Sequence, residues 1–317
     1  MPGAILADRF DRKKVMILSW ILWLPVPYLL STATYWNQLF PAMILYGVFI
    51  GTPSTTAYIA SSARRDKTTL TFMLLSSSWS IGYIFSPTIG GYLATSVGMR
   101  TVFRLVLLFY LMATIILFFI DEQRGTTERN SERIGERATV ERKHIAAWTA
   151  FFALIFFVDV LTRPFIPTLL QDAYSFNEFQ IGIFGSITFA GSALLGVLIG
   201  RIGDSAGNKV AIAISMAFGA VSLTLLQLSS SLLILIPTSF MIGATYAPWP
   251  LMNATISTIA PEKARWRWVA LCQSMSMSAA FVAPYIGGNL YAVSPNLPFI
   301  VAIVGSTILS ALILSRR

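Results

Sequence analysis

Long apolar stretches, separated by short polar ones, follow one another along the whole chain. No Asp, Glu, Lys or Arg occurs in four segments, which are 15–63, 68–99, 210–261 and 268–315. Because a helix needs about 20 apolar residues to cross the hydrocarbon layer of a membrane, each segment can hold one or two membrane-spanning helices. The pattern therefore predicts an all-α integral membrane protein.

Polar and Gly/Pro-rich breaks divide these stretches into about ten expected membrane-spanning helices. The polar residues at 35–38 separate the first two spans, and the serines at 229–231 separate two later ones. With boundaries drawn at such breaks, the expected spans are 15–35, 39–61, 69–93, 101–120, 145–170, 179–200, 209–229, 232–259, 268–292 and 297–315.

The order of the spans repeats within the chain. The string PTIGG at 87–91 returns as PYIGG at 284–288, 197 residues later. An aspartate followed by a basic residue five positions on occurs at 8–13 and again at 204–209, an offset of 196 residues. Two unrelated landmarks with almost the same offset indicate a duplication. Many secondary transporters are duplicated helical bundles with the substrate path between the halves.

The first copy is shorter than the second by about two helices, because 59 residues separate Ile145 from Asp204 whereas 7 residues precede Asp8. We expect two further helices before Met1 in the native product. The alternative is a truncated, non-transporting remnant or a wrongly chosen start codon. The expected domains are an incomplete bundle of four spans at 1–120, a cytoplasmic linker at 121–144 and a six-helix bundle at 145–317. The polar linker is read as a connection, with a regulatory docking site as the alternative.

Basic residues are concentrated on alternate connections between the spans. Of the 23 Lys and Arg residues, 20 lie before residue 15, at 64–67, in the linker, at 201–209, at 263–267 and at the C-terminus. The positive-inside rule therefore places both termini and the linker in the cytoplasm. The net charge of +9 is explained by this topology, so no nucleic-acid partner is expected.

The composition argues against other functional classes. Hydrophobic residues make up 55% and charged residues 12% of the chain, against about 25% charged in ordinary soluble domains. One Cys and one His, Cys272 and His144, leave no residues for an internal disulfide, a zinc site or a His-assisted nucleophile in the membrane. No Gly-rich phosphate loop or filter-like repeat is visible. We expect neither an enzyme nor a cofactor or metal.

Two loops resemble a signature of major facilitator superfamily transporters. The segment 2–14, PGAILADRFDRKK, resembles the loop between their second and third helices, and 200–209, GRIGDSAGNK, resembles its half-repeat. The resemblance implies a conformational latch; the alternative is ordinary topology-setting charge. Ala4, Asp11 and Ser205 depart from the usual pattern. The residues implied in the latch are Asp8, Arg9, Arg12, Lys13, Gly200, Asp204, Gly207 and Lys209.

The segment 82–91, GYIFSPTIGG, resembles the fifth-helix motif that the superfamily associates with exporters exchanging substrate for protons. Proline kinks a helix and glycines form a flat face for close packing, so simple packing is the alternative reading. Ser86 replaces a glycine of the pattern. The motif residues are Gly82, Ser86, Pro87, Gly90 and Gly91, with Pro284, Gly287 and Gly288 in the second copy.

The span 39–61 carries no charged residue, whereas many proton-coupled members of the superfamily have an Arg in the fourth helix. This departure from the family pattern argues against the usual proton relay.

Helix breaks at matching places in the two halves point to a substrate cavity. The span 232–259 has prolines on both sides of Trp249, with Asn253 one turn further on, and a proline occurs at the matching position 53. Broken helices at corresponding places in two halves indicate a binding site, which makes Asn253 a candidate.

Asp159 and Arg163 are the candidates for ion coupling. Asp159 lies 14 residues into the span that begins at Ile145, about 21 Å along a helix at 1.5 Å per residue. Ionisable groups at such depth are costly and usually face a cavity or a partner. Their i,i+4 spacing allows a structural ion pair. The functional alternative is that Asp159 takes up a proton or a cationic substrate when the pair opens, with Arg163 as the competing charge.

Together, these features predict a secondary active transporter of the duplicated six-helix type. The resemblance implies a permease of the multidrug/proton antiporter-like branch that exports a small molecule by alternating access in exchange for protons. The expected partners are a small-molecule substrate, protons and the lipid bilayer. We expect a monomer in the plasma membrane.

Overall fold

The computed structural model describes residues 12–47, 55, 58, 68–121, 139–261 and 265–315, and every regular element in these ranges is a helix. The expected latch residues at 8–9 and most of the expected linker lie outside the described residues.

Eight helices in this part of the chain are long and apolar enough to cross a membrane. They are Lys13–Thr32, Met99–Phe118, His144–Asp172, Glu178–Ala206, Asn208–Leu228, Leu232–Ile256, Trp268–Val293 and Leu297–Ser315. The expected all-α membrane fold is confirmed. Of the two remaining expected spans, 39–61 is described only in part, and 69–93 lies within the helix α6 (Thr68–Val97).

The helices group into two compact units. Unit 1 comprises Met1–Gly82 and Ile89–Ser131, and unit 2 comprises Tyr83–Thr88 and Glu132–Arg317. The elements of unit 1 are α2 (Arg12–Trp23), α3 (Pro25–Thr32), the 3-10 turn η1 (Trp36–Gln38), α4 (Leu39–Gly47), most of α6, and α7 (Met99–Phe118).

Aromatic rings join the helices of unit 1. Within it, α3 packs against both α4 and α7. The Trp23 ring stacks on Tyr46 of α4 at 4.9 Å between centroids and on Tyr110 of α7 at 6.1 Å. Offset or stacked aromatic pairs at such distances add packing energy beyond the area they bury.

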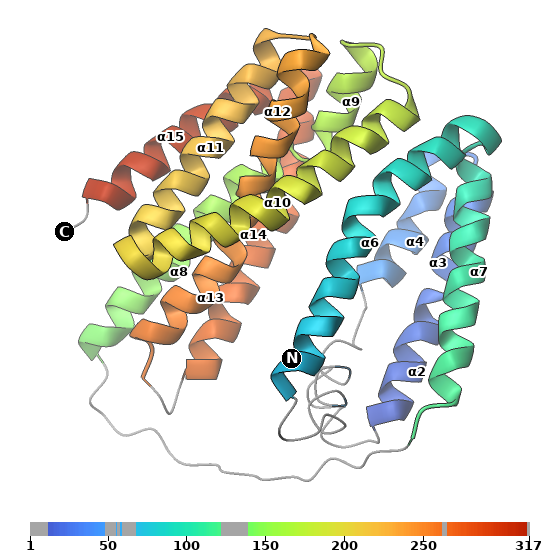
Figure 1. Cartoon of the computed structure of the whole chain (residues 1–317), viewed down its shortest axis with the longest axis horizontal. Helices are drawn as coiled ribbons and strands as arrows, with labels where there is room; N and C mark the ends of the chain where they lie inside the picture. Colours follow the sequence, from blue (N-terminus) through green and yellow to red (C-terminus); the bar gives the residue numbers. More distant parts are fainter. Residues whose placement is uncertain are drawn as a thin grey trace. The chain divides into compact units, whose positions relative to one another are not determined.

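Unit 2 contains six membrane-spanning stretches, two of which are interrupted. Its helices are α8 (Thr139–Thr162), α9 (Phe165–Asp172), α10 (Glu178–Ala206), α11 (Asn208–Leu228), α12 (Leu232–Ile242), α13 (Pro248–Ile259), α14 (Arg265–Val293) and α15 (Leu297–Ser315), with the 3-10 turn η2 (Gly243–Tyr246) between α12 and α13. In this unit α8 packs against α14, α11 against α15, and α10 against α12 (Figure 1).

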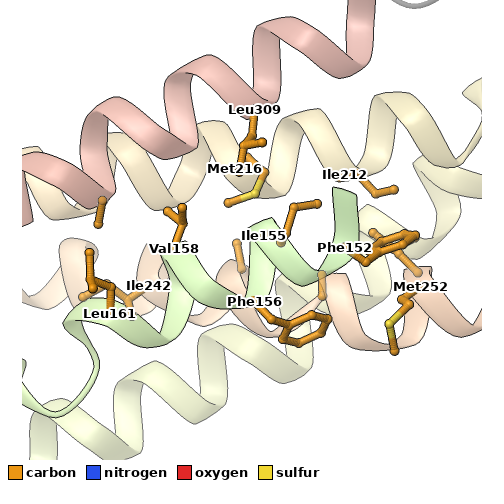
Figure 2. Packing of buried hydrophobic residues seen from close by; sticks show 14 of the residues in the cluster. Phe152, Ile155, Phe156, Val158, Leu161, Ile212, Met216, Ile242, Met252 and Leu309 are labelled. Atoms are coloured by element: carbon orange, nitrogen blue, oxygen red, sulfur yellow. The ribbon is translucent and has the colours of Figure 1, made fainter. Parts of the chain in front are cut away.

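The core of unit 2 is built around α8. Side chains of α8 lie among side chains from α11, α12, α13 and α15 (Figure 2). The α8 residues are Phe152, Ile155, Phe156, Val158 and Leu161, and their labelled neighbours are Ile212, Met216, Ile242, Met252 and Leu309. Lipid tails are as apolar as leucine, so close packing rather than removal from water holds such helices together in a membrane.

Both interrupted spans break next to proline. Between α8 and α9, Arg163 and Pro164 leave the helix, and α13 begins at Pro248 after η2. Proline has no N–H to donate and favours the first turn of a helix, so each proline starts a new helical segment. The predicted break in 232–259 is therefore present at the proline pair.

Glycine allows a close helix crossing at one of these breaks. A Cβ added to Gly191 of α10 would lie 2.0 Å from the Phe240 carbonyl oxygen, and one added to Gly243 would lie 2.2 Å from the Ser192 nitrogen. No side chain fits at either position, so the backbones of α10 and the α12–η2 junction are in direct contact.

The connection between α9 and α10 is anchored by polar contacts. The Tyr174 hydroxyl donates to the Leu226 carbonyl at the end of α11. Asn177 caps α10, because its side chain accepts from the Gln180 N–H at 2.9 Å, a typical N-cap arrangement. Burial raises the pKa of the Tyr174 phenol.

Candidate functional site

Among the carboxylates of unit 2 whose burial the structure describes, the buried one belongs to Asp159. It lies in the second half of α8, with 8% of its surface exposed. Its Oδ2 atom is buried and has no hydrogen-bond partner. Buried polar groups normally have partners, and a buried charge without one is costly. A carboxyl group in such surroundings can hold a proton or accept a hydrogen bond from a polar ligand.

Arg163 follows α8 directly and reaches the other helix break. Its Nη2 atom donates to the Thr245 carbonyl oxygen at 3.1 Å. Its guanidinium carbon lies 4.3 Å from the centroid of the Tyr246 ring, within the range of a cation–π interaction. Its Nε atom is buried without a hydrogen-bond partner. The break in one span is thus connected to the break in the other.

The expected contact between Asp159 and Arg163 takes a different form. The structure records no ion pair between these two described residues, and the contacts of Arg163 are with η2 instead. The i,i+4 rule holds within one helix. Here α8 ends at Thr162, one residue before Arg163, and the guanidinium donates to the Thr245 carbonyl oxygen of the 3-10 turn.

Both side chains line one small cavity of about 20 Å³, which is room for a molecule the size of water. Asp159 and Arg163 are the charged residues of its lining, and hydroxyl groups from three other spans join them. The lining residues are Val158, Asp159, Thr162, Arg163, Ile166, Gly219, Ser222, Leu223, Ile242, Thr245 and Ser306. A cavity lined by charged and hydroxyl groups as well as apolar side chains can hold a proton or a small polar group inside a membrane-spanning bundle.

The expected latch residues are described only in part. Asp8 and Arg9 lie outside the described residues, and Arg12 begins α2. The Lys13 ammonium donates to the Phe118 carbonyl oxygen at 3.0 Å, within unit 1.

In the second copy, the loop sits at the junction of α10 and α11. Gly207, with φ of 94°, ends one helix and precedes the other, a conformation that favours glycine. Gly200 and Asp204 lie in the last turns of α10, Asp204 with an exposed side chain, and Lys209 lies in the first turn of α11. Asn208, which the sequence reasoning did not single out, donates to the Thr255 hydroxyl oxygen of α13 at 3.1 Å.

The two copies of the proline–glycine motif lie inside long helices. Pro87 is within α6, together with Gly82, Ser86, Gly90 and Gly91, and Pro284 is within α14. In α14, a Cβ on Gly287 would lie 2.5 Å from the Leu161 carbonyl oxygen, and one on Gly288 would lie 3.8 Å from Phe165. The second copy therefore allows α14 to pack closely against the α8–α9 break.

Asn253 contacts a residue that sequence reasoning missed. Its Oδ1 atom accepts a hydrogen bond from Gln273 Nε2 of α14 at 2.9 Å. The contacts of Thr245 and Tyr246 were also not predicted, because the sequence signalled only a helix break, at the prolines that follow these two residues.

The described part of the chain also has an apolar pocket of about 300 Å³ between α10 and α12.

Comparison with known proteins identifies the family. The chain matches the Major Facilitator Superfamily over residues 1–158 and again over residues 149–317, and the two matches together cover its whole length. The chain belongs to the Major Facilitator Superfamily. As a member of this superfamily it is a multi-pass membrane transporter and not an enzyme, as its sequence predicted.

Relatives of this superfamily member include proteins named as drug efflux pumps. It is 25% identical over 315 residues to the multi-drug resistance efflux pump PmrA homolog of Lactococcus lactis, covering 96% of this chain and 76% of that protein. It is 27% identical over 292 residues to PmrA of Streptococcus pneumoniae, covering 89% and 73%. It is 25% identical to multidrug resistance protein 2 of Bacillus subtilis, covering 93% and 76%.

Solved structures of transporters share the fold of this superfamily member. A crystal structure of a mutant nucleoside transporter NupG matches with a TM-score of 0.83 at 14% identity, covering 99% of this chain and 85% of that one. A bacterial homolog of the human lysosomal transporter Spinster matches with a TM-score of 0.72 at 16% identity, covering 98% and 84%. At such identities the likeness concerns the fold alone.

Proposed function

We propose that this chain is a secondary active exporter that moves small molecules out of the cell by alternating access in exchange for protons. The observation that carries the proposal is the carboxyl group of Asp159, buried in a membrane-spanning helix with an unpartnered oxygen. Such a group can hold a proton in one step of the cycle and release it in another. In this proposal Arg163 is the competing charge.

Two further observations support export of varied molecules. Several relatives that match most of this chain are named multidrug efflux pumps or resistance proteins. The proline–glycine pattern of α6 and α14 resembles the motif that the superfamily associates with exporters. On this basis the proposed substrates are small molecules of varied structure, and the coupling ion is the proton.

The proposal includes a topology and an architecture. The basic residues place both termini and the 121–144 segment on the cytoplasmic side of the plasma membrane, by the positive-inside rule. Residues 145–317 form the six-helix lobe and residues 1–120 hold four spans. The loops around Lys13 and Asp204 act as latches between conformations, and the transporter works as a monomer.

Transport in proteoliposomes tests this function. The purified chain is reconstituted, and a pH gradient is imposed across the membrane. In exchange for protons, ethidium should move toward the acidic side, and its movement is followed by fluorescence. The unmodified chain should move ethidium only with the gradient. The Asp159→Asn variant should lose gradient-driven movement, because the amide cannot take up and release a proton.

The matched control is Asp172→Asn, the same change at an exposed carboxylate at the end of α9. It should transport as the unmodified chain does. Gradient-driven transport that persists in Asp159→Asn would reduce Asp159 to a structural role. Absence of transport by the unmodified chain would instead favour the non-transporting alternative.

A further inference from the structure

Tyr246 presents an aromatic face at the break between α12 and α13. It is the last residue of η2 and is half-buried. The Phe189 ring of α10 lies 5.5 Å from the Tyr246 ring, centroid to centroid, at an angle of 46°. The Arg163 guanidinium carbon lies 4.3 Å from the centroid of the same Tyr246 ring. The ring is therefore supported by an aromatic neighbour and covered by a cation.

Arg163, the cation on this ring, makes its printed contacts with η2 and no recorded ion pair with Asp159 among the described residues. The neighbouring carbonyl, that of Thr245, accepts from Arg163 Nη2 at 3.1 Å. Meanwhile Asp159 Oδ2 and Arg163 Nε are both buried without hydrogen-bond partners while lining one cavity. The structure holds the Arg163 side chain on η2. A move of the guanidinium toward Asp159 would give both unpartnered atoms a partner.

We propose that the face of Tyr246 is a recognition site for an organic cation, and that Arg163 covers this face until such a cation displaces it. The inference rests on the exporter function proposed above and names a substrate class for it. A guanidinium is a weakly hydrated, delocalised cation. An organic cation with a spread charge has the same chemistry, whereas a small inorganic cation is held more strongly by water.

Displacement of Arg163 also links the substrate to the proton. When an organic cation takes the ring, the guanidinium moves to Asp159, and the protonated carboxyl group releases its proton to water. The resulting carboxylate pairs with the guanidinium. One positive charge enters the site and one proton leaves it, so the net charge is unchanged. Asp159 and Arg163 are the charged residues that line this cavity.

Equilibrium binding of radiolabelled tetraphenylphosphonium to the purified full chain in detergent tests the inference. The Arg163→Gln variant should bind about tenfold more tightly, because the tethered competitor is gone, and Tyr246→Leu about tenfold more weakly. Tyr246→Phe should keep the affinity within about twofold, because the aromatic face remains. In the Tyr246→Leu background, Arg163→Gln should change affinity by less than about twofold, since the two residues act at one site.

Two controls guard against a misfolded variant or a nonspecific apolar site. Tyr246→Phe with increasing fluorination of the ring keeps the side-chain shape while weakening its negative face, so affinity should fall stepwise. Tetraphenylborate has the same shape with the opposite charge and should not compete. Parental affinity in folded Tyr246→Leu, weaker binding in Arg163→Gln, a flat fluorination series, or equal competition by tetraphenylborate would each overturn the proposal.

The binding series is independent of transport. If tetraphenylphosphonium binding follows Tyr246 and Arg163 as expected but the unmodified chain moves no ethidium with a pH gradient, the proposed export fails and the recognition site stands. If proton-driven transport is present but binding ignores Tyr246, the recognition site fails and the export function stands.

Discussion

The glycines of the repeated proline–glycine pattern have different surroundings in the two units. In α6, a Cβ placed on Gly90 would meet no atom within 4 Å, whereas in α14 a Cβ on the corresponding Gly287 would lie 2.5 Å from the Leu161 carbonyl oxygen. The glycine of the second copy of the motif is thus required for a close helix contact in unit 2. The corresponding glycine of the first copy, in unit 1, has room for a side chain. A motif shows that small residues are present, and the contacts show which of them the fold requires.

The largest expected effect tests this difference within a single helix. In α10, a Cβ on Gly191 would lie 2.0 Å from the Phe240 carbonyl oxygen and 2.9 Å from the Phe240 Cα, whereas one on Gly196 would meet no atom within 4 Å. Backbone atoms cannot rotate away, so Gly191→Ala should lower the free energy of unfolding by about 3 kcal/mol. Gly196→Ala should be neutral or stabilising by up to about 1 kcal/mol, because alanine favours a helix more than glycine.

Unfolding of the purified variants in a denaturing-detergent titration measures both changes. If Gly191→Ala and Gly196→Ala lowered the free energy of unfolding equally, the loss of glycine itself would determine stability. The close crossing of α10 with the α12–η2 junction would then have no special role.

A smaller effect is expected for the two copies of the motif. In Gly287→Ala the new methyl group meets the Leu161 carbonyl oxygen and, at 2.7 Å, the edge of the Phe165 ring. The ring can move but the carbonyl cannot, so the expected loss is about 1–2 kcal/mol. Gly90→Ala should not destabilise the chain. Thermal unfolding in mild detergent compares the stability of the two variants. A larger loss of stability in Gly90→Ala than in Gly287→Ala would show that the first copy of the motif, and not the second, needs its glycine for close packing.

Sequence patterns predicted the fold well because membrane-spanning helices follow from length and apolarity. The six spans of unit 2 lie close to their expected ranges, and the proline pair at 248–250 marked the break that became η2. Boundaries within a broken span were harder to predict. The sequence was read as one span over 145–170, although the helix is interrupted after Thr162, next to Pro164.

The candidate site was predicted only in part. Depth in a span singled out Asp159 and Arg163, and both line one cavity. The i,i+4 rule compares residues on one helix, so it could not reveal that Arg163 contacts Thr245 and Tyr246 from a span 82 residues away. Contacts between distant helices depend on how the breaks face each other, and no local pattern encodes that arrangement.

The smallest expected effect concerns a place where unit 2 is held by a hydrogen bond instead of a glycine contact. Tyr174→Phe removes the hydroxyl that donates to the Leu226 carbonyl and should cost about 1 kcal/mol of unfolding free energy. Burial raises the pKa of Tyr174 in the folded state above its ordinary value of 10.0. The contribution of a group with a raised folded pKa is fully present below the unfolded pKa and is lost as the pH rises through the folded one.

The unmodified chain should therefore lose stability relative to Tyr174→Phe as the pH rises above about 10. The difference between the two unfolding free energies, measured from pH 7 to 11, should be constant at neutral pH and shrink as the pH rises through about 10, since the phenylalanine cannot ionise. Tyr285→Phe, at an exposed tyrosine of α14, is the matched control and should show no loss of unfolding free energy at neutral pH. A constant difference across the whole range would mean that Tyr174 contributes through packing alone, as Gly287 does, and not through its hydroxyl.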